Sequence, residues 1–137
     1  MKKFVIDASV VVKAMLNEDN KIALRLEKLL KRADKNEVEV ISSPLLVIEV
    51  CNGFRFGIRE KSKSLVVFAD FLRLPIKIVN LTKYQIEKSL ALAYDRGTSV
   101  YDASYHILAK ANSAIFLTCD NEYYNRAREL GDIKLLV

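Results

Sequence analysis

The chain has 137 residues, of which 51% are apolar, and a formal net charge of +5. A sequence of this length and apolar content can bury one hydrophobic core, which excludes an intrinsically disordered protein and favours a single domain over residues 1–137. No apolar run is long and uncharged enough to span a bilayer, and Asp7 and Lys13 exclude a signal peptide, so we expect a cytoplasmic protein without a membrane partner.

Strand-like apolar runs alternate with helix-like stretches along the chain. We expect strands at 3–7, 38–41, 76–79, 114–118 and 133–137. We expect helices at 9–16, 21–32, 44–56, 60–74, 83–96, 100–111 and 121–130. This alternation predicts an α/β fold in which a twisted parallel sheet of four or five strands is flanked by helices.

Several helices carry start signals in the sequence. Asn20 is a candidate N-cap, and Ser43 followed by Pro44 is typical of a helix start. Thr82 and Gln85 have the spacing of a capping box, in which each side chain bonds the backbone of the other. Ser99 begins a further helix in the same way.

Two strands each end in an acidic residue. The run 4–6 is followed by Asp7, and the run 114–119 is followed by Asp120. The carboxyl ends of parallel strands meet at one edge of a sheet, so both charges point to one place. Carboxylates held close together resist joint ionisation unless a cation lies between them. Taken alone, each residue has a simpler interpretation as a helix N-cap.

Two further acidic residues lie on helices that are expected to flank this edge. Glu49 interrupts an apolar run, so its carboxylate needs a partner, and an ion pair with Arg55 or Arg59 is the alternative to a site role. Asp102 stands three residues after Ser99 and could simply complete a capping box. One residue can serve both purposes, and four idle carboxylates in these places are harder to explain than one site.

A site with oxygen ligands and no His or Cys suits Mg²⁺ or Mn²⁺. Asn121 and Glu122 lie beside Asp120 as possible additional ligands. Such a cation can hold a phosphate oxygen and activate a water. An acidic pocket in a basic protein fits a nuclease, because surrounding Lys and Arg can hold the phosphate backbone.

At this point the sequence resembles the PIN-domain nucleases, and most closely the toxin half of VapBC toxin–antitoxin pairs. The resemblance covers nearly the whole chain, and its motifs are short but occur in the family's order. They are 5–9 (VIDAS), Glu49 after Ser43 and Pro44, 101–105 (YDASY) with 108–109 (LA), and 118–120 (TCD).

The resemblance implies a PIN fold and an Mg²⁺- or Mn²⁺-dependent endoribonuclease. It carries the family's acidic metal-binding set onto Asp7, Glu49, Asp102 and Asp120. Ser9 and Thr118 match small hydroxyl residues that help to order such pockets. Relatives form homodimers and are silenced by an antitoxin protein. Some carry another acid soon after the late Asp, where this chain has Asn121 and Glu122, which puts a second metal position in question.

Other features have an ordinary structural interpretation. We expect His106 to be a partly buried packing residue; the alternative is that it orients Asp102 or contacts the substrate. We expect Arg126 to be solvated; the alternative is that it faces the groove. The stretch 54–63 mixes aromatic and basic residues; we favour a partner surface there over an RNA-binding one. We expect Cys51 and Cys119 to be buried free thiols, because their spacing does not fit a zinc site.

Three other functions are compatible with parts of the pattern. The first is a housekeeping PIN nuclease in RNA maturation. The second is a non-catalytic PIN-like binding protein in which the acids only cap helices. The third is a phosphoryl-transfer enzyme with Asp7 as nucleophile, which ranks last because the stretch 7–9 lacks the second Asp of haloacid-dehalogenase-type phosphatases.

Overall fold

The computed structural model describes all residues, 1–137, and confirms the predicted α/β architecture. Five parallel strands form one sheet in the order β3-β2-β1-β4-β5. The strands are β1 (Lys2–Ile6), β2 (Val38–Ser42), β3 (Lys77–Ile78), β4 (Ile115–Thr118) and β5 (Ile133–Leu135). The chain starts in the middle of the sheet and adds strands first to one side of β1 and then to the other, so β1 is central.

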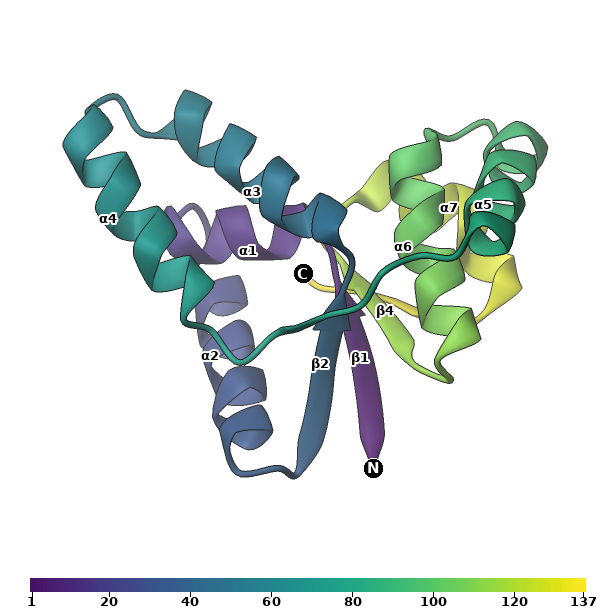
Figure 1. The fold of residues 1–137 in the computed structure, drawn as a ribbon, viewed down its shortest axis with the longest axis horizontal. Coiled ribbons are helices and arrows are strands. Elements are labelled where there is room, and N and C mark those ends of the chain that lie inside the picture. The colour runs from purple at the N-terminus through teal and green to yellow at the C-terminus, as the bar shows by residue number, and fades with distance from the viewer.

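Helices connect the strands and lie in two groups (Figure 1). They are α1 (Ala8–Met15), α2 (Asn20–Asp34), α3 (Pro44–Gly57), α4 (Lys61–Leu72), α5 (Lys83–Arg96), α6 (Val100–Ala111), α7 (Asn121–Ala127) and a short 3₁₀ helix, η1 (Arg128–Leu130). In Figure 1, α1 to α4 lie on one side of the sheet and α5 to α7 on the other. The carboxyl ends of β1 and β2 point to the junction between these two groups.

The core forms where the helices pack on the central strands. Val5 and Ile6 of β1 and Phe116 of β4 are inaccessible to solvent, and they belong to one continuous cluster of 22 buried apolar residues. Near-continuous apolar runs are what a parallel sheet covered on both faces requires. The buried centre of the sheet therefore provides a rigid base for the residues that follow the strands.

The start of α2 differs from the prediction, and α3 begins as predicted but without a side-chain capping bond. Asp19, not Asn20, is the N-cap of α2, and its carboxylate accepts hydrogen bonds from the backbone of Lys21 and Ile22. Ser43 occupies the N-cap position of α3, but its hydroxyl makes no capping bond and is buried without a partner. Pro44, with its helix-compatible backbone angle, follows directly at the first helical position of α3.

The predicted capping box of α5 is present. The backbone N–H of Gln85 donates to Thr82 Oγ1 at 3.1 Å, and the backbone N–H of Thr82 donates to Gln85 Oε1 at 3.0 Å. We expect Thr82→Ala to lower the free energy of unfolding by about 1 kcal/mol in urea denaturation. Glu87→Ala, at an exposed position of the same helix, should change it by no more than about 0.5 kcal/mol. Equal effects of the two substitutions would contradict a stabilising role for the box.

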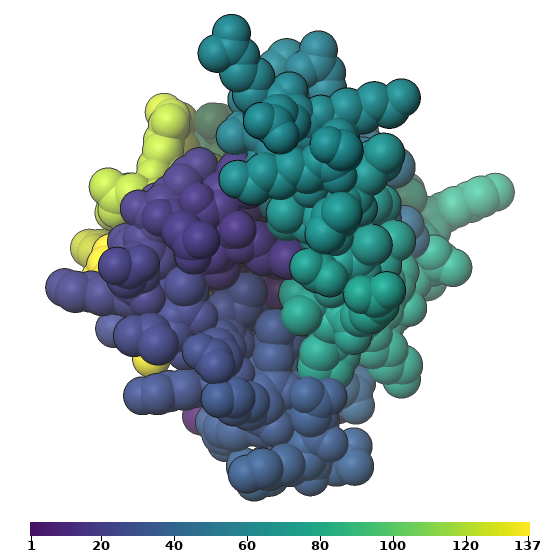
Figure 2. Space-filling model, turned by 90° about the vertical axis from the view of Figure 1, so that its left-hand side faces the viewer, coloured from purple at the N-terminus to yellow at the C-terminus, as the bar shows by residue number.

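The side chains of α3 and α4 correct two further expectations. Phe54 does not form a partner surface, because it is 1% exposed and packs edge-on against Phe68 and Phe71 of α4. Phe56 is 78% exposed. Both cysteines are free, but neither is buried as expected, because Cys51 is exposed and Cys119 is half-buried. Figure 2 shows the side of the molecule on which α4, in teal, lies at the surface. No helix of the structure has the length and apolarity needed to cross a membrane.

Candidate active site

Asp7 lies at the centre of the sheet edge. It follows β1, and Ile6 pairs with Leu117 of β4, so Asp7 stands beside Thr118. Its side chain is only 4% exposed and both carboxylate oxygens accept hydrogen bonds. Ser9 Oγ donates to Oδ1 at 2.5 Å, and Thr118 Oγ1 donates to Oδ2 at 2.5 Å. The backbone N–H of Val10 adds a longer bond of 3.3 Å to Oδ1 as the capping contact of α1.

The two hydroxyl groups are themselves held by the loop that follows β4. The backbone N–H of Cys119 donates to Ser9 Oγ at 3.0 Å, and that of Asp120 donates to Thr118 Oγ1 at 3.0 Å. Each hydroxyl accepts one bond and has its proton left to donate to Asp7. These two relays fix the carboxylate and link the ends of β1 and β4. The residues that the family resemblance assigned to ordering the pocket therefore contact Asp7 directly.

Burial makes the ionised form of Asp7 costly. It raises the pKa of this carboxyl group to about 6, although the bonds from Ser9 and Thr118 act in the opposite direction. The negative charge of Asp102 adds a smaller upward contribution to the pKa. Asp7 is thus an acidic group whose ionisation the fold resists and a nearby cation would favour.

Asp102 and Asp120 lie at the starts of two helices, α6 and α7. Asp102 is in the first turn of α6, and its pKa is raised mainly by burial and then by the charge of Asp120, with smaller contributions from Glu49 and Glu122. Asp120 is the N-cap of α7 and accepts a 3.0 Å bond from a backbone N–H of its first turn. Asp102 and Asp120 line the same cavity of about 140 Å³.

A role as a simple helix cap accounts for Asp120 only in part and does not account for the carboxylate of Asp102. The hydroxyl of Ser99 caps α6 by accepting from the backbone N–H of Asp102 at 3.1 Å, but the Asp102 carboxylate makes no return bond to the backbone of Ser99. Asp102 therefore does not complete a capping box. Asp120 does cap α7, yet its second carboxylate oxygen accepts no hydrogen bond.

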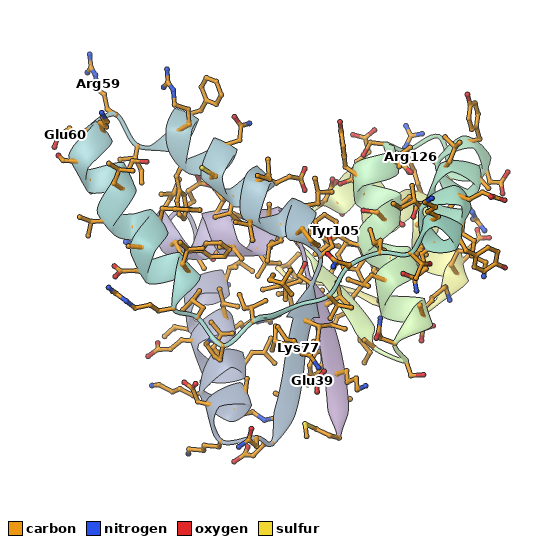
Figure 3. All side chains as sticks on the ribbon, viewed as in Figure 1. Glu39, Arg59, Glu60, Lys77, Tyr105 and Arg126 are labelled. Carbon is orange, nitrogen blue, oxygen red and sulfur yellow. The ribbon has the colours of Figure 1, made fainter.

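Glu49 reaches the site from α3. It does not form the predicted alternative ion pair with Arg55 or Arg59; Figure 3 shows Arg59 at the far tip of α3 and α4, well away from Tyr105. Instead, Glu49 Oε1 accepts a 2.5 Å hydrogen bond from the hydroxyl of Tyr105. Tyr105 belongs to a motif singled out in the sequence, but no sequence signal identified this contact.

No Lys, Arg or His neutralises the four carboxylates, since none of them takes part in an ion pair. Their oxygen-only chemistry and unbalanced charge fit a hard divalent cation such as Mg²⁺ or Mn²⁺. No group of three or more His, Cys, Asp or Glu side chains is arranged in this structure so that it could hold a metal ion. The carboxylate oxygens are thus chemically suited to a divalent cation. That these four residues bind one together is a prediction.

The remaining candidates near Asp120 differ in their contacts. Glu122 is exposed and pairs with Arg126 at 3.2 Å, and both residues line the cavity next to Asp102 and Asp120. Arg126 also donates to the carbonyl of Gly97 at 3.1 Å, so it is not simply solvated as expected (Figure 3). Asn121 is exposed at the start of α7, and its side chain makes no hydrogen bond.

His106 is a structural residue, as predicted, but it is fully rather than partly buried. Its Nε2 lies 2.7 Å from the carbonyl oxygen of Gly131, which can only accept, so Nε2 carries the proton. In the neutral ring Nδ1 then accepts from the hydroxyl of Tyr123, 2.8 Å away. Burial lowers the pKa of His106, which agrees with a neutral ring.

Comparisons with known proteins agree with the fold. A family model described as the PIN domain matches residues 4–129. A search of curated protein sequences found no match. The protein PAE2754 of Pyrobaculum aerophilum has a similar structure, with a TM-score of 0.65, 21% identity and coverage of 91% of this chain and 86% of that one.

Two other solved structures are similar over nearly their whole length. VapBC2 of Rickettsia felis, bound to a DNA fragment from its promoter, has a TM-score of 0.70 and 15% identity, and covers 98% of this chain and 97% of that one. VapC20 of Mycobacterium tuberculosis, a toxin that cleaves the sarcin–ricin loop, has a TM-score of 0.66 and 13% identity, and covers 89% and 94%. At these identities the similarity is one of fold.

Proposed function

Because this chain belongs to the PIN domain family, we propose that it is a single-domain, metal-dependent endoribonuclease and the toxin of a toxin–antitoxin pair. The observation that carries the proposal is that Asp102 lies near enough to Asp7, Glu49 and Asp120 for their charges to act on one another, while none of these four carboxylates has a cationic partner. The fold shared with toxins of other organisms supports the same assignment.

In this proposal the four carboxylates hold Mg²⁺ or Mn²⁺. When bound, such a cation neutralises charge on a phosphate and lowers the pKa of a coordinated water. The hydroxyls of Ser9 and Thr118 keep Asp7 in one orientation, so its ligand atoms are set before binding. Water attack on the phosphodiester forms one P–O bond and breaks another. A carboxylate of this group accepts the proton of the water, and the leaving oxygen takes up a proton from solvent to depart as a hydroxyl.

The partners follow from the same proposal. The substrate is RNA, and the net charge of +5 favours association with its phosphate backbone. We infer that an antitoxin protein silences the enzyme and that the chain forms a homodimer in the cytoplasm, as the family resemblance implies. A short reading frame encoding an antitoxin next to the gene would distinguish the toxin from a housekeeping PIN nuclease.

The direct test is incubation of a mixture of structured RNAs with the purified protein in Mg²⁺, in Mn²⁺ and in EDTA. We expect cleavage with either cation and none in EDTA, because four unbalanced carboxylates cannot hold a phosphate without a metal. Mn²⁺ binding is measured in parallel by calorimetry. A folded protein that neither cleaves RNA nor binds Mn²⁺ would contradict the proposal and favour the non-catalytic binding protein.

A further inference from the structure

The carboxylate of Glu49 has one hydrogen-bond partner in the structure, the hydroxyl of Tyr105. The two residues are 56 positions apart and come from different helices, α3 and α6, with an Oη to Oε1 distance of 2.5 Å. Figure 3 places Tyr105 at the junction between the two groups of helices. The bond therefore connects the α3 side of the site to the side that carries Asp102.

The ring of Tyr105 is held rigidly. It is 1% exposed and stacks on Phe116 of β4, with ring centroids 5.9 Å apart and an angle of 19° between the planes. Phe116 is itself inaccessible to solvent at the centre of the sheet. A ring packed in this way places its hydroxyl at one point. Glu49, in contrast, is half-buried and has a long side chain that would otherwise lose orientation.

A tyrosine hydroxyl is also the right kind of group for this position. It orients a carboxylate by donating a single hydrogen bond, and it brings no positive charge that would compete with a cation. Burial and the adjacent charge of Glu49 raise the pKa of Tyr105, so the donor keeps its proton. Only Oε1 is engaged, which leaves Oε2 free as a ligand.

Two of the other acidic residues are held in a different way. Asp7 is fixed by Ser9 and Thr118, and Asp120 is fixed by the helix that it caps. Glu49 alone reaches the site from α3, and its carboxylate depends on a side chain of another helix.

We propose that Tyr105 is a positioning residue that holds Glu49 in its metal-binding orientation. The proposal rests on the function proposed above. Hydrogen-bonded partners of metal-binding side chains typically change metal affinity by about 10- to 100-fold when they are removed. Tyr105 would then set the affinity of the site without touching the cation or the RNA.

The test compares Mn²⁺ affinity, measured by calorimetry, in the wild type, Tyr105→Phe, Glu49→Gln and the double variant. We expect Tyr105→Phe to weaken binding about tenfold and Glu49→Gln to weaken it more. We expect the double variant to bind no more weakly than Glu49→Gln, because Tyr105 acts through Glu49. The matched control is Ser89→Ala, which removes a buried hydroxyl of α5 that donates to the carbonyl oxygen of Gln85 and does not line the cavity of Asp102 and Asp120, and which should leave Mn²⁺ affinity unchanged.

Three results would overturn the proposal. Wild-type affinity in Tyr105→Phe, with weaker binding in Glu49→Gln, would refute the role of Tyr105 and leave the nuclease assignment intact. Equal losses in Tyr105→Phe and Ser89→Ala, together with equal losses of stability without metal, would show a general packing effect. Absence of Mn²⁺ binding by the wild type would instead reject the proposed function itself, and the role of Tyr105 with it.

Discussion

Asp7→Asn is expected to reduce RNA cleavage by about 100- to 1000-fold and, at the same time, to stabilise the metal-free protein. The loss follows because the substitution removes a charged ligand at the centre of the site, and removal of a group that acts directly on the reacting atoms commonly costs about this much. The gain follows from the burial of Asp7, whose side chain is 4% exposed and bonded only to neutral donors. An amide at this position has no charge to desolvate.

The sign of the stability effect comes from the pKa of Asp7, which the fold raises from 3.8 to about 6. A raised folded-state pKa means that the folded protein binds this proton more tightly than the unfolded chain. Ionised Asp7 therefore destabilises the fold above pH 6, by up to about 3 kcal/mol, and the penalty is relieved as the pH falls from 6 to 4. Asn offers only one acceptor oxygen, so one of the two hydroxyls that donate to Asp7 loses its acceptor, which offsets at least about 1 kcal/mol of this gain. We expect Asp7→Asn to raise the free energy of unfolding at pH 7.5 by up to about 2 kcal/mol in urea denaturation without metal.

This pair of effects separates a site residue from a helix cap. Asn is as good an N-cap as Asp, so a residue that only caps α1 would tolerate the change in both measurements. Asp19→Asn is the matched control, because Asp19 is also an N-cap aspartate, at α2, but its carboxylate is bonded only to backbone N–H groups of that helix. We expect wild-type cleavage and nearly wild-type stability for Asp19→Asn. Full cleavage activity in Asp7→Asn would exclude Asp7 from the chemistry.

The fold was predictable because its signals are local. Apolar runs and helix caps depend on neighbouring residues, and the capping box of Thr82 and the start of α6 at Val100 are found where the sequence places them. Asn20 fails as an N-cap because Asp19, one residue earlier, presents a carboxylate to the same backbone groups. Periodicity locates such a helix to within a residue or two but does not decide between adjacent polar side chains.

The site was predictable only as a set of residue types. Strand ends and helix starts identified Asp7 and Asp120, but the pairing register of β1 and β4 decides that Thr118, and not Asp120, lies next to Asp7. The contact between Tyr105 and Glu49 depends on two helices meeting across the sheet edge. No local pattern encodes that distance, and a tyrosine amid apolar residues is ordinarily read as part of the core.

The prediction of which side chains are exposed on α3 and α4 was wrong for a related reason. The mixture of aromatic and basic residues in 54–63 suggested a partner surface. In the structure, Phe54 of α3 packs in the core and Phe56 is exposed. Which face of a helix is buried is set by the partner helix, here α4, and its position follows from the fold as a whole. The exposure of Cys51 on the same helix has the same origin.

The second large effect concerns pH. We expect the affinity for Mn²⁺ to fall as the pH decreases below 6, because a carboxylate must lose its proton before it can bind a metal. Each carboxyl group that is protonated in this range should contribute a fall of about tenfold per pH unit. Asp7, with a pKa of about 6, supplies one proton, and Asp102, whose pKa is raised by burial and by the charge of Asp120, is the second group that competes with the cation. Well above pH 6, Asp7 is ionised and the affinity should no longer depend on its proton.

Calorimetry in two buffers of different ionisation enthalpy measures this exchange directly, as the number of protons released when Mn²⁺ binds. We expect release of about half a proton or more at pH 6 and close to none at pH 8, since these groups are the titrating ligands in that range. His106 does not contribute, because its ring is buried and neutral with both nitrogens bonded to Tyr123 and Gly131. If binding at pH 6 released no proton, Asp7 could not be a ligand, because a group of that pKa must lose its remaining proton to the cation.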